Sequence, residues 1–216
     1  AILTFTTVVC LLVMACAAFM SWWLDQPIWY FTQDPATTTL SSWSIGIVSQ
    51  VGVVLWSAAT AVCALAGALL WPLRARRQAA LFAFASGALT AIYLLDDALL
   101  IHEDILPDHL GIPEMASYAA YGALGLAYLV HFVQDLRRTD YVILLASLAL
   151  GGISMAVDVI NPYLFLVEDG AKFLAIALWF AYYFQAMTTL VRENLASPPA
   201  RRVSPNVLGK PLQILT

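Results

Sequence analysis

Six long apolar stretches divide this chain, and they constrain its fold more than any other feature. A helix needs about 20 mostly apolar residues to cross the roughly 30 Å hydrocarbon core of a bilayer. Because a segment in lipid must satisfy its own backbone hydrogen bonds, each stretch is expected to be helical. The stretches run approximately over residues 1–20, 43–71, 79–102, 115–132, 141–160 and, from a start between 163 and 170, to 191. The sequence therefore predicts an all-α, polytopic membrane bundle of six transmembrane helices within residues 1–194, followed by a proline-containing cytoplasmic tail at 195–216.

The composition supports a membrane protein and excludes several other classes. Hydrophobic residues make up 62% of the chain and charged residues 11%, against about 45–50% and 25% in soluble domains. A soluble enzyme of this size could not bury so much apolar surface, and a disordered chain needs high charge and low hydrophobicity. A nucleic-acid binder is excluded because the formal net charge is −4 and the ten Lys and Arg residues form no continuous stripe. The first stretch lacks the basic segment that opens a secretory signal, so we expect it to span the membrane.

The distribution of charge predicts the orientation of the bundle. Cytoplasmic loops of membrane proteins carry an excess of Lys and Arg. In a six-span arrangement, nine of the ten basic residues fall on one side, namely Arg74, Arg76, Arg77, Arg137, Arg138, Arg192, Arg201, Arg202 and Lys210. Eleven of the fourteen acidic residues fall on or near the other side. We therefore expect both termini in the cytoplasm and a location of the bacterial inner-membrane type.

The remaining charged side chains gather at the outer ends of the third, fifth and sixth stretches. Ionised groups in hydrocarbon cost about 2.5–3.5 kcal/mol each on insertion scales, so they mark functional or paired groups. Asp96 and Glu103 are seven residues apart and are expected to share one face of a continuous helix. The candidate metal ligands in this cluster are Asp96, His102, Glu103, Asp158 and Glu168. The candidate catalytic groups are Asp97 or Asp169, as a base, and Lys172, as a charge stabiliser.

Three interpretations of this cluster remain open. Carboxylates with an imidazole suit a divalent metal such as zinc, manganese or iron, which would be the cofactor of an enzyme. An acidic funnel at the outer face could instead conduct protons or cations. The charged groups could also form a buried ionic lock that fixes helix register and does little else. Glu168 and Lys172 are four residues apart, in the favourable order for a helical ion pair.

Two further features concern packing and partners. The first outer loop is rich in aromatic side chains, including Trp22, Trp23, Trp29 and Tyr30, which predict interfacial anchors or a contact surface for another subunit. Small residues in the fourth and fifth stretches, among them Gly122, Gly125, Gly151 and Gly152, predict close helix packing.

These features predict two classes of function. An accessory subunit would pack against a larger membrane complex through the aromatic loop and the tail, and this interpretation ranks first. The alternative is a membrane-embedded, metal-dependent enzyme, or a cation- or proton-binding protein, with an acidic and histidine site at the outer face. Lipid and other membrane subunits are the expected partners in the first case.

Overall fold

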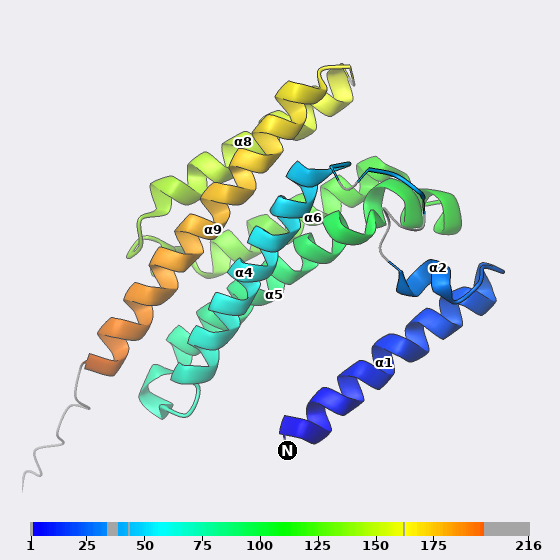
Figure 1. Cartoon of the computed structure of the whole chain (residues 1–216). Helices are drawn as coiled ribbons and strands as arrows, with labels where there is room; N and C mark the ends of the chain where they lie inside the picture. The colour runs from blue at the N-terminus through cyan, green and yellow to red at the C-terminus, as the bar shows by residue number, and fades with distance from the viewer. Residues whose placement is uncertain (1, 34–38, 43, 162, 197–216) are drawn as a thin grey trace, which may run out of the picture. The chain divides into compact units, whose positions relative to one another are not determined.

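The computed structural model describes residues 2–33, 39–42, 44–161 and 163–196, and within them it contains helices and no β-strand. Figure 1 shows the long helices. The elements are α1 (Ile2–Trp23), α2 (Trp29–Thr32), α4 (Ile47–Leu70), η1 (Arg74–Arg76), α5 (Arg77–Leu99), η2 (Ile101–His109), α6 (Glu114–His131), α7 (Val133–Leu136), α8 (Tyr141–Ile160) and α9 (Phe165–Ala196). The predicted all-α class is confirmed for these residues. The predicted tail, from residue 197 onward, lies outside them.

Among the described residues, four helices are long and apolar enough to cross a membrane, which indicates membrane integration. They are Ile47–Leu70, Arg74–Leu99, Tyr141–Ile160 and Phe165–Ala196. The other two predicted spans correspond to helices α1 and α6, but neither belongs to this group of four. α6 carries Glu114, His131 and three tyrosines within its 18 residues, which lowers its hydropathy.

The helix boundaries follow the apolar pattern closely, with one exception. α8 has the predicted bounds, and α9 begins inside the predicted window. The third stretch, however, does not continue to residue 102 as one helix. α5 ends at Leu99, Leu100 takes a left-handed conformation with φ 52°, and a π-helical turn, η2, follows. The expectation that Asp96 and Glu103 share a continuous helical face is therefore wrong.

Contacts divide the chain into two units, Ala1–Ile47 and Val48–Thr216. In the first unit, the aromatic side chains at the end of α1 pack on one another. The ring centroid of Phe19 lies 5.9 Å from that of Trp22 and 6.2 Å from that of Trp23. Trp22 is nevertheless 77% exposed, and Trp29 and Tyr30 are about half exposed. These side chains are therefore exposed in this unit, and their role as interfacial anchors or as a contact surface stays a prediction.

The long helices of the second unit alternate in direction, because short connections join them. α8 and α9 pack against each other along their lengths, as Figure 1 also shows. α4 and α5 meet closely at Gly67, where an added Cβ would lie 2.7 Å from the ring of Phe84. A hydrogen bond of 3.4 Å from Gln78 Nε2 to Asp135 Oδ2 joins the start of α5 to α7. The two arginine-bearing connections therefore lie at one end of this unit.

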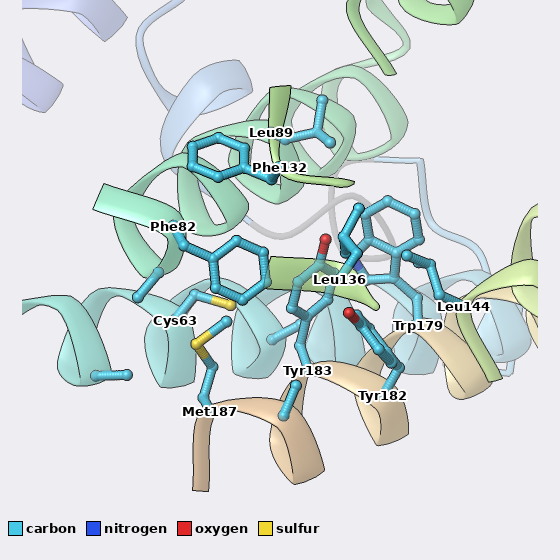
Figure 2. Packing of buried hydrophobic residues seen from close by; sticks show 14 of the residues in the cluster. Cys63, Phe82, Leu89, Phe132, Leu136, Leu144, Trp179, Tyr182, Tyr183 and Met187 are labelled. Atoms are coloured by element: carbon cyan, nitrogen blue, oxygen red, sulfur yellow. The ribbon is translucent and has the colours of Figure 1, made fainter. Parts of the chain in front are cut away.

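The core of the second unit combines aromatic packing with buried hydrogen bonds. Figure 2 shows Phe82, Tyr182, Tyr183 and Met187 among its side chains. The Tyr128 hydroxyl lies 2.7 Å from that of Ser86 and accepts a hydrogen bond of 3.0 Å from Tyr183. These bonds join α5, α6 and α9, as is common between membrane helices. η2 and the α8–α9 connection lie at the opposite end of the unit, outside this hydrogen-bonded core.

Candidate functional site

A cavity of about 710 Å³ opens among α5, α6, α8 and α9, with Trp56 of α4 on its wall. This volume is within the roughly 300–1,000 Å³ that small-molecule pockets occupy. One end is polar and is lined by Asp96, Asp97, His102, Glu103, Glu114, Tyr118, Tyr121, Asp158, Glu168 and Lys172. The remainder is mostly apolar. The cavity thus has a charged end and an apolar interior.

Asp96 is the most constrained polar group in the cavity. Its side chain is buried near the end of α5, and its carboxylate accepts three hydrogen bonds. Oδ1 accepts one of 2.6 Å from the Tyr121 hydroxyl and one of 3.1 Å from the backbone N–H of His102. Oδ2 lies 2.5 Å from Nδ1 of His102. Because burying a carboxylate is costly unless its oxygens are hydrogen-bonded, these partners explain how Asp96 stays in place.

The backbone break at Leu100 brings His102 back onto Asp96. A left-handed conformation is unusual for a residue with a branched side chain, and such strain tends to be kept at functional sites. After this turn the N–H of His102 faces Asp96 instead of continuing the α-helical ladder. A regular helix would have pointed His102 in another direction, so the break makes the Asp96–His102 pair.

The second ring nitrogen of His102 faces two other carboxylates of the cavity. Nε2 lies 3.6 Å from Oε1 of Glu103 and 3.9 Å from Oε1 of Glu114. Neither separation is a hydrogen bond. Since an ionised Asp96 can only accept, the proton of a neutral His102 belongs on Nδ1. Nε2 is then an unprotonated acceptor on the wall of the cavity.

A tyrosine connects Glu114 to the carboxylate of Asp158. The Tyr118 hydroxyl lies 2.5 Å from Oε1 of Glu114, which begins α6, and 3.1 Å from Oδ2 of Asp158, near the end of α8. The ring of Tyr118 also lies 5.2 Å from the imidazole of His102, centroid to centroid. Tyr118 thus links α6 to α8 at the polar end.

An ion pair closes the side of the cavity between α5 and α9. Nζ of Lys172 lies 2.6 Å from Oδ1 of Asp97. The Asp97 side chain is 10% exposed and that of Lys172 is 42% exposed. Asp97, one of the two predicted bases, and Lys172, the predicted charge stabiliser, therefore form an ion pair with each other in this structure.

The structure brings most of the predicted cluster to one place. Seven of the eight predicted metal-binding and catalytic residues line the cavity, and the exposed Asp169 does not. Of the five predicted ligands, Asp96 and His102 bond to each other. In the part of the chain that the structure describes, no three His, Cys, Asp or Glu side chains form a group that could hold a metal ion. The metal site stays a prediction.

Two glycines of the cavity wall do not pack against other helices as the sequence suggests. A Cβ added at Gly122 of α6 or at Gly152 of α8 would meet no described atom within 4 Å. Gly125 and Gly151 do approach neighbours, with Tyr93 Oη at 3.0 Å and Ala175 Cβ at 3.9 Å from the added atom. Gly122 and Gly152 therefore widen the cavity instead of bringing helices together.

Stability should depend on pH through His102, which lies beyond the end of α5. The hydrogen bond to the Asp96 carboxylate raises the pKa of His102 above its ordinary value of 6.5. Burial lowers this pKa, but the negative charges of Asp96, Glu103 and Glu114 raise it further. A raised folded-state pKa stabilises the fold fully below about pH 6.5, and this stabilisation is lost as the pH rises through the folded-state pKa.

We therefore expect His102→Gln to lower the free energy of unfolding more at acidic than at alkaline pH. The measurement is reversible unfolding in detergent at several pH values for the wild type, His102→Gln and His131→Gln, the last controlling for loss of an imidazole elsewhere on the chain. A difference between wild type and His102→Gln that grows as the pH rises would contradict the Asp96–His102 pair.

Comparison with known proteins gives a family but no described activity. No curated protein and no solved structure matches the chain. The sequence model of one family, a domain of unknown function (DUF8692), matches residues 3–186. This range covers α1 through most of α9, including the whole polar end of the cavity. The chain therefore belongs to the DUF8692 family.

Proposed function

We propose that this protein is a membrane-embedded enzyme that uses His102 as a general base on a substrate held in the cavity. The observation that carries the proposal is the Asp96–His102 pair: Nδ1 of His102 lies 2.5 Å from Oδ2 of Asp96, and both residues line the cavity. A histidine oriented by a buried carboxylate is a recurring device for removing a proton from a hydroxyl group or a water molecule.

Each partner of the pair has a separate role in this mechanism. His102 accepts the proton at Nε2 and becomes an imidazolium, which the negative charge of Asp96 stabilises. The Tyr121 hydroxyl at 2.6 Å keeps Asp96 ionised and oriented, so Tyr121 and Asp96 are positioning residues. Glu103 and Glu114 lie close enough to Nε2 to attract its proton after transfer. Efficient general bases have pKa values near the working pH, which a raised histidine pKa provides.

We further propose a six-span arrangement in a membrane of the bacterial inner-membrane type, with both termini in the cytoplasm. Support comes from Arg74, Arg76 and Arg137, which lie at the end of the second unit away from the cavity's polar end. The polar end of the cavity then faces the outer side. A substrate could reach it from the outer leaflet or from the aqueous phase.

The proposal is tested by incubating the purified full chain, in nanodiscs, with a total bacterial lipid extract. Untargeted mass spectrometry of the lipids before and after incubation detects chemical change in every lipid class, whichever of them contains the substrate. We expect at least one lipid class to decrease and a product to accumulate with time. An extract that stays unchanged in every lipid class, with folded protein present throughout, would overturn the proposal.

The predicted divalent metal is compatible with this site but is not needed for the base. Nδ1 of His102 is bonded to Asp96, so Nε2 is the nitrogen that can bind either a metal ion or a proton. Elemental analysis of the purified protein distinguishes the two, because a resident metal would be present in about one equivalent per chain and would be lost in His102→Gln.

An accessory-subunit function is the second candidate, and the exposed aromatic side chains of the first unit favour it. Trp22 is 77% exposed and Trp23, Trp29 and Tyr30 about half exposed, whereas large aromatic groups are enriched where proteins meet other proteins or the membrane interface. Mild extraction from the native membrane followed by native mass spectrometry separates the candidates. An assembly much larger than the 23.5 kDa chain and containing other proteins would support a subunit; a monomer or small homo-oligomer would contradict it.

A further inference from the structure

The cavity that contains the Asp96–His102 pair extends far beyond it into apolar surroundings. Along α8 its lining residues run from Leu144 to Asp158, and along α6 from Glu114 to Leu129. At about 1.5 Å per helical residue, each range corresponds to roughly 20 Å. One leaflet of a bilayer core of about 30 Å is about 15 Å deep. The cavity is therefore long enough for a whole lipid chain.

The apolar part of the cavity is kept open by missing side chains. Gly122 and Gly152 line it from α6 and α8, and an added Cβ at either would meet no described atom within 4 Å. Glycine inside a helix costs about 1 kcal/mol relative to alanine. Since neither glycine permits a close helix contact, the space that they leave is available to a ligand. Trp56 and Trp179 supply broad apolar walls on other sides.

A buried polar atom on the same wall lacks a partner. Among the described residues, Nε1 of Trp56 is buried without a hydrogen bond, and Trp56 lines the cavity. Buried polar groups normally have hydrogen-bond partners. Ser154 of α8 also lines the cavity; it lies four residues before Asp158, so both are on one face of α8. The cavity wall therefore carries polar groups besides the charged residues.

The charge of the polar end selects the head of that ligand. Six carboxylates line this end, whereas the cationic candidates there are His102 and Lys172. Asp96 is bonded to His102 and Asp97 to Lys172. Four further carboxylates share the polar end with these two pairs, those of Glu103, Glu114, Asp158 and Glu168. Because negative charge is in excess there, an anionic head would be repelled and an ammonium group would be attracted.

We infer that the cavity binds a single-chain amphiphile with a cationic amine head, its head among these carboxylates and its chain between α6 and α8 past Gly122 and Gly152. This inference rests on the proposed function, for which it names the substrate class. The head then lies beside Nε2 of His102, which removes a proton from a hydroxyl group or a water molecule next to the head and becomes an imidazolium. The chain fills the apolar length of the cavity.

The inference is tested with three probes that share one chain and differ in head: dodecylamine, dodecanol and dodecyl phosphate. Native mass spectrometry of the full chain in a neutral detergent gives the affinity of each. We expect the amine to bind at least about tenfold more tightly than the phosphate, which corresponds to roughly 1.4 kcal/mol, with the alcohol between them. Equal binding of all three probes, or tighter binding of the phosphate, would overturn the inference.

Two variants test the position of the chain. Gly122→Leu and Gly152→Leu should each weaken dodecylamine binding by about tenfold or more, because the leucine side chain fills the space meant for the ligand. Gly170→Leu is the matched control: Gly170 lies in α9, outside the cavity lining, with open space at its Cβ among the described residues. Thermal melting followed by circular dichroism identifies any variant that fails to fold. If one glycine variant fails to fold, dodecylamine binding by the other glycine variant tests the position of the chain.

The outcomes separate the ligand from the enzyme. Dodecylamine binding and turnover of the lipid extract are both measured on the wild-type protein, so that each proposal is tested separately. If both glycine variants bind dodecylamine as tightly as the wild type, the proposed position of the ligand's chain is wrong. The proposed enzyme would not be affected by that result, because it is tested by the His102-dependent turnover of lipid extract. Normal amine binding without any turnover would instead overturn the enzyme.

Discussion

Replacing His102 by glutamine is expected to slow lipid turnover by about 10²–10⁴-fold, the contribution of a positioned acid–base group. Glutamine has a similar length and still offers an acceptor to the cavity, but it cannot accept a proton near neutral pH. The measurement is the initial rate of product formation from lipid extract by wild-type and variant protein in nanodiscs. His109→Gln, at the end of η2 and outside the cavity lining, is the control.

Asp96→Asn shows whether Asp96 acts through His102. The amide keeps the shape of the side chain but removes the charge that raises the pKa of His102. Because His102 must be unprotonated to act as a base, the wild-type rate rises with pH through this raised pKa. In Asp96→Asn the rate should be lower at its plateau and should begin to rise at a lower pH. A variant with a normal rate and an unshifted pH profile would show that Asp96 is only structural.

The largest expected effect on stability comes from Lys172→Met. The substitution leaves the Asp97 carboxylate, which is 10% exposed, without the ammonium group 2.6 Å away. Removing one partner of a buried ion pair costs about 3–5 kcal/mol. Because water reaches Lys172, whose side chain is 42% exposed, we expect about 3 kcal/mol of lost unfolding free energy, the lower end of that range. Reversible unfolding in mixed micelles gives the value.

Two companion variants identify the cause. Lys172→Arg preserves the charge and should lose little stability. The double substitution Asp97→Asn with Lys172→Met removes both charges and should be more stable than Lys172→Met alone, because no unpaired carboxylate remains. If Lys172→Met unfolds like the wild type, α5 and α9 are not joined by this pair, and the ionic-lock interpretation is wrong.

The helices were largely predictable from the sequence, because apolar periodicity and length determine them. The bounds of α8 agree fully with the apolar pattern, and those of α4, α6 and α9 differ by a few residues. The convergence of Asp96, Asp97, Asp158 and Lys172 was also expected, since charged groups in apolar helices turn toward one another. The sequence of α6 already distinguished it from the four most apolar helices, because Glu114, His131 and three tyrosines lower its hydropathy.

The details that make the site depend on tertiary contacts that a sequence pattern does not contain. Nothing at Leu100 indicates a helix end, because glycine is the residue that usually takes a left-handed conformation. Tyr118 and Tyr121 resemble ordinary membrane tyrosines in the sequence, yet their hydroxyl groups organise Asp96, Glu114 and Asp158. Gly122 was visible in the sequence as one of several small residues. Small residues alone, however, do not distinguish close helix packing from the wall of a cavity.

The pairing of Asp96 with His102 is the central claim, and ¹⁵N NMR of histidine-labelled protein in micelles tests it most directly. The chain has three histidines, so single His→Gln variants assign the signals. Above its pKa, His102 should show a proton on Nδ1 and a free Nε2, and it should titrate above its ordinary value of 6.5. In Asp96→Asn the titration should move to lower pH. A His102 signal that titrates identically in the wild type and in Asp96→Asn would contradict the account.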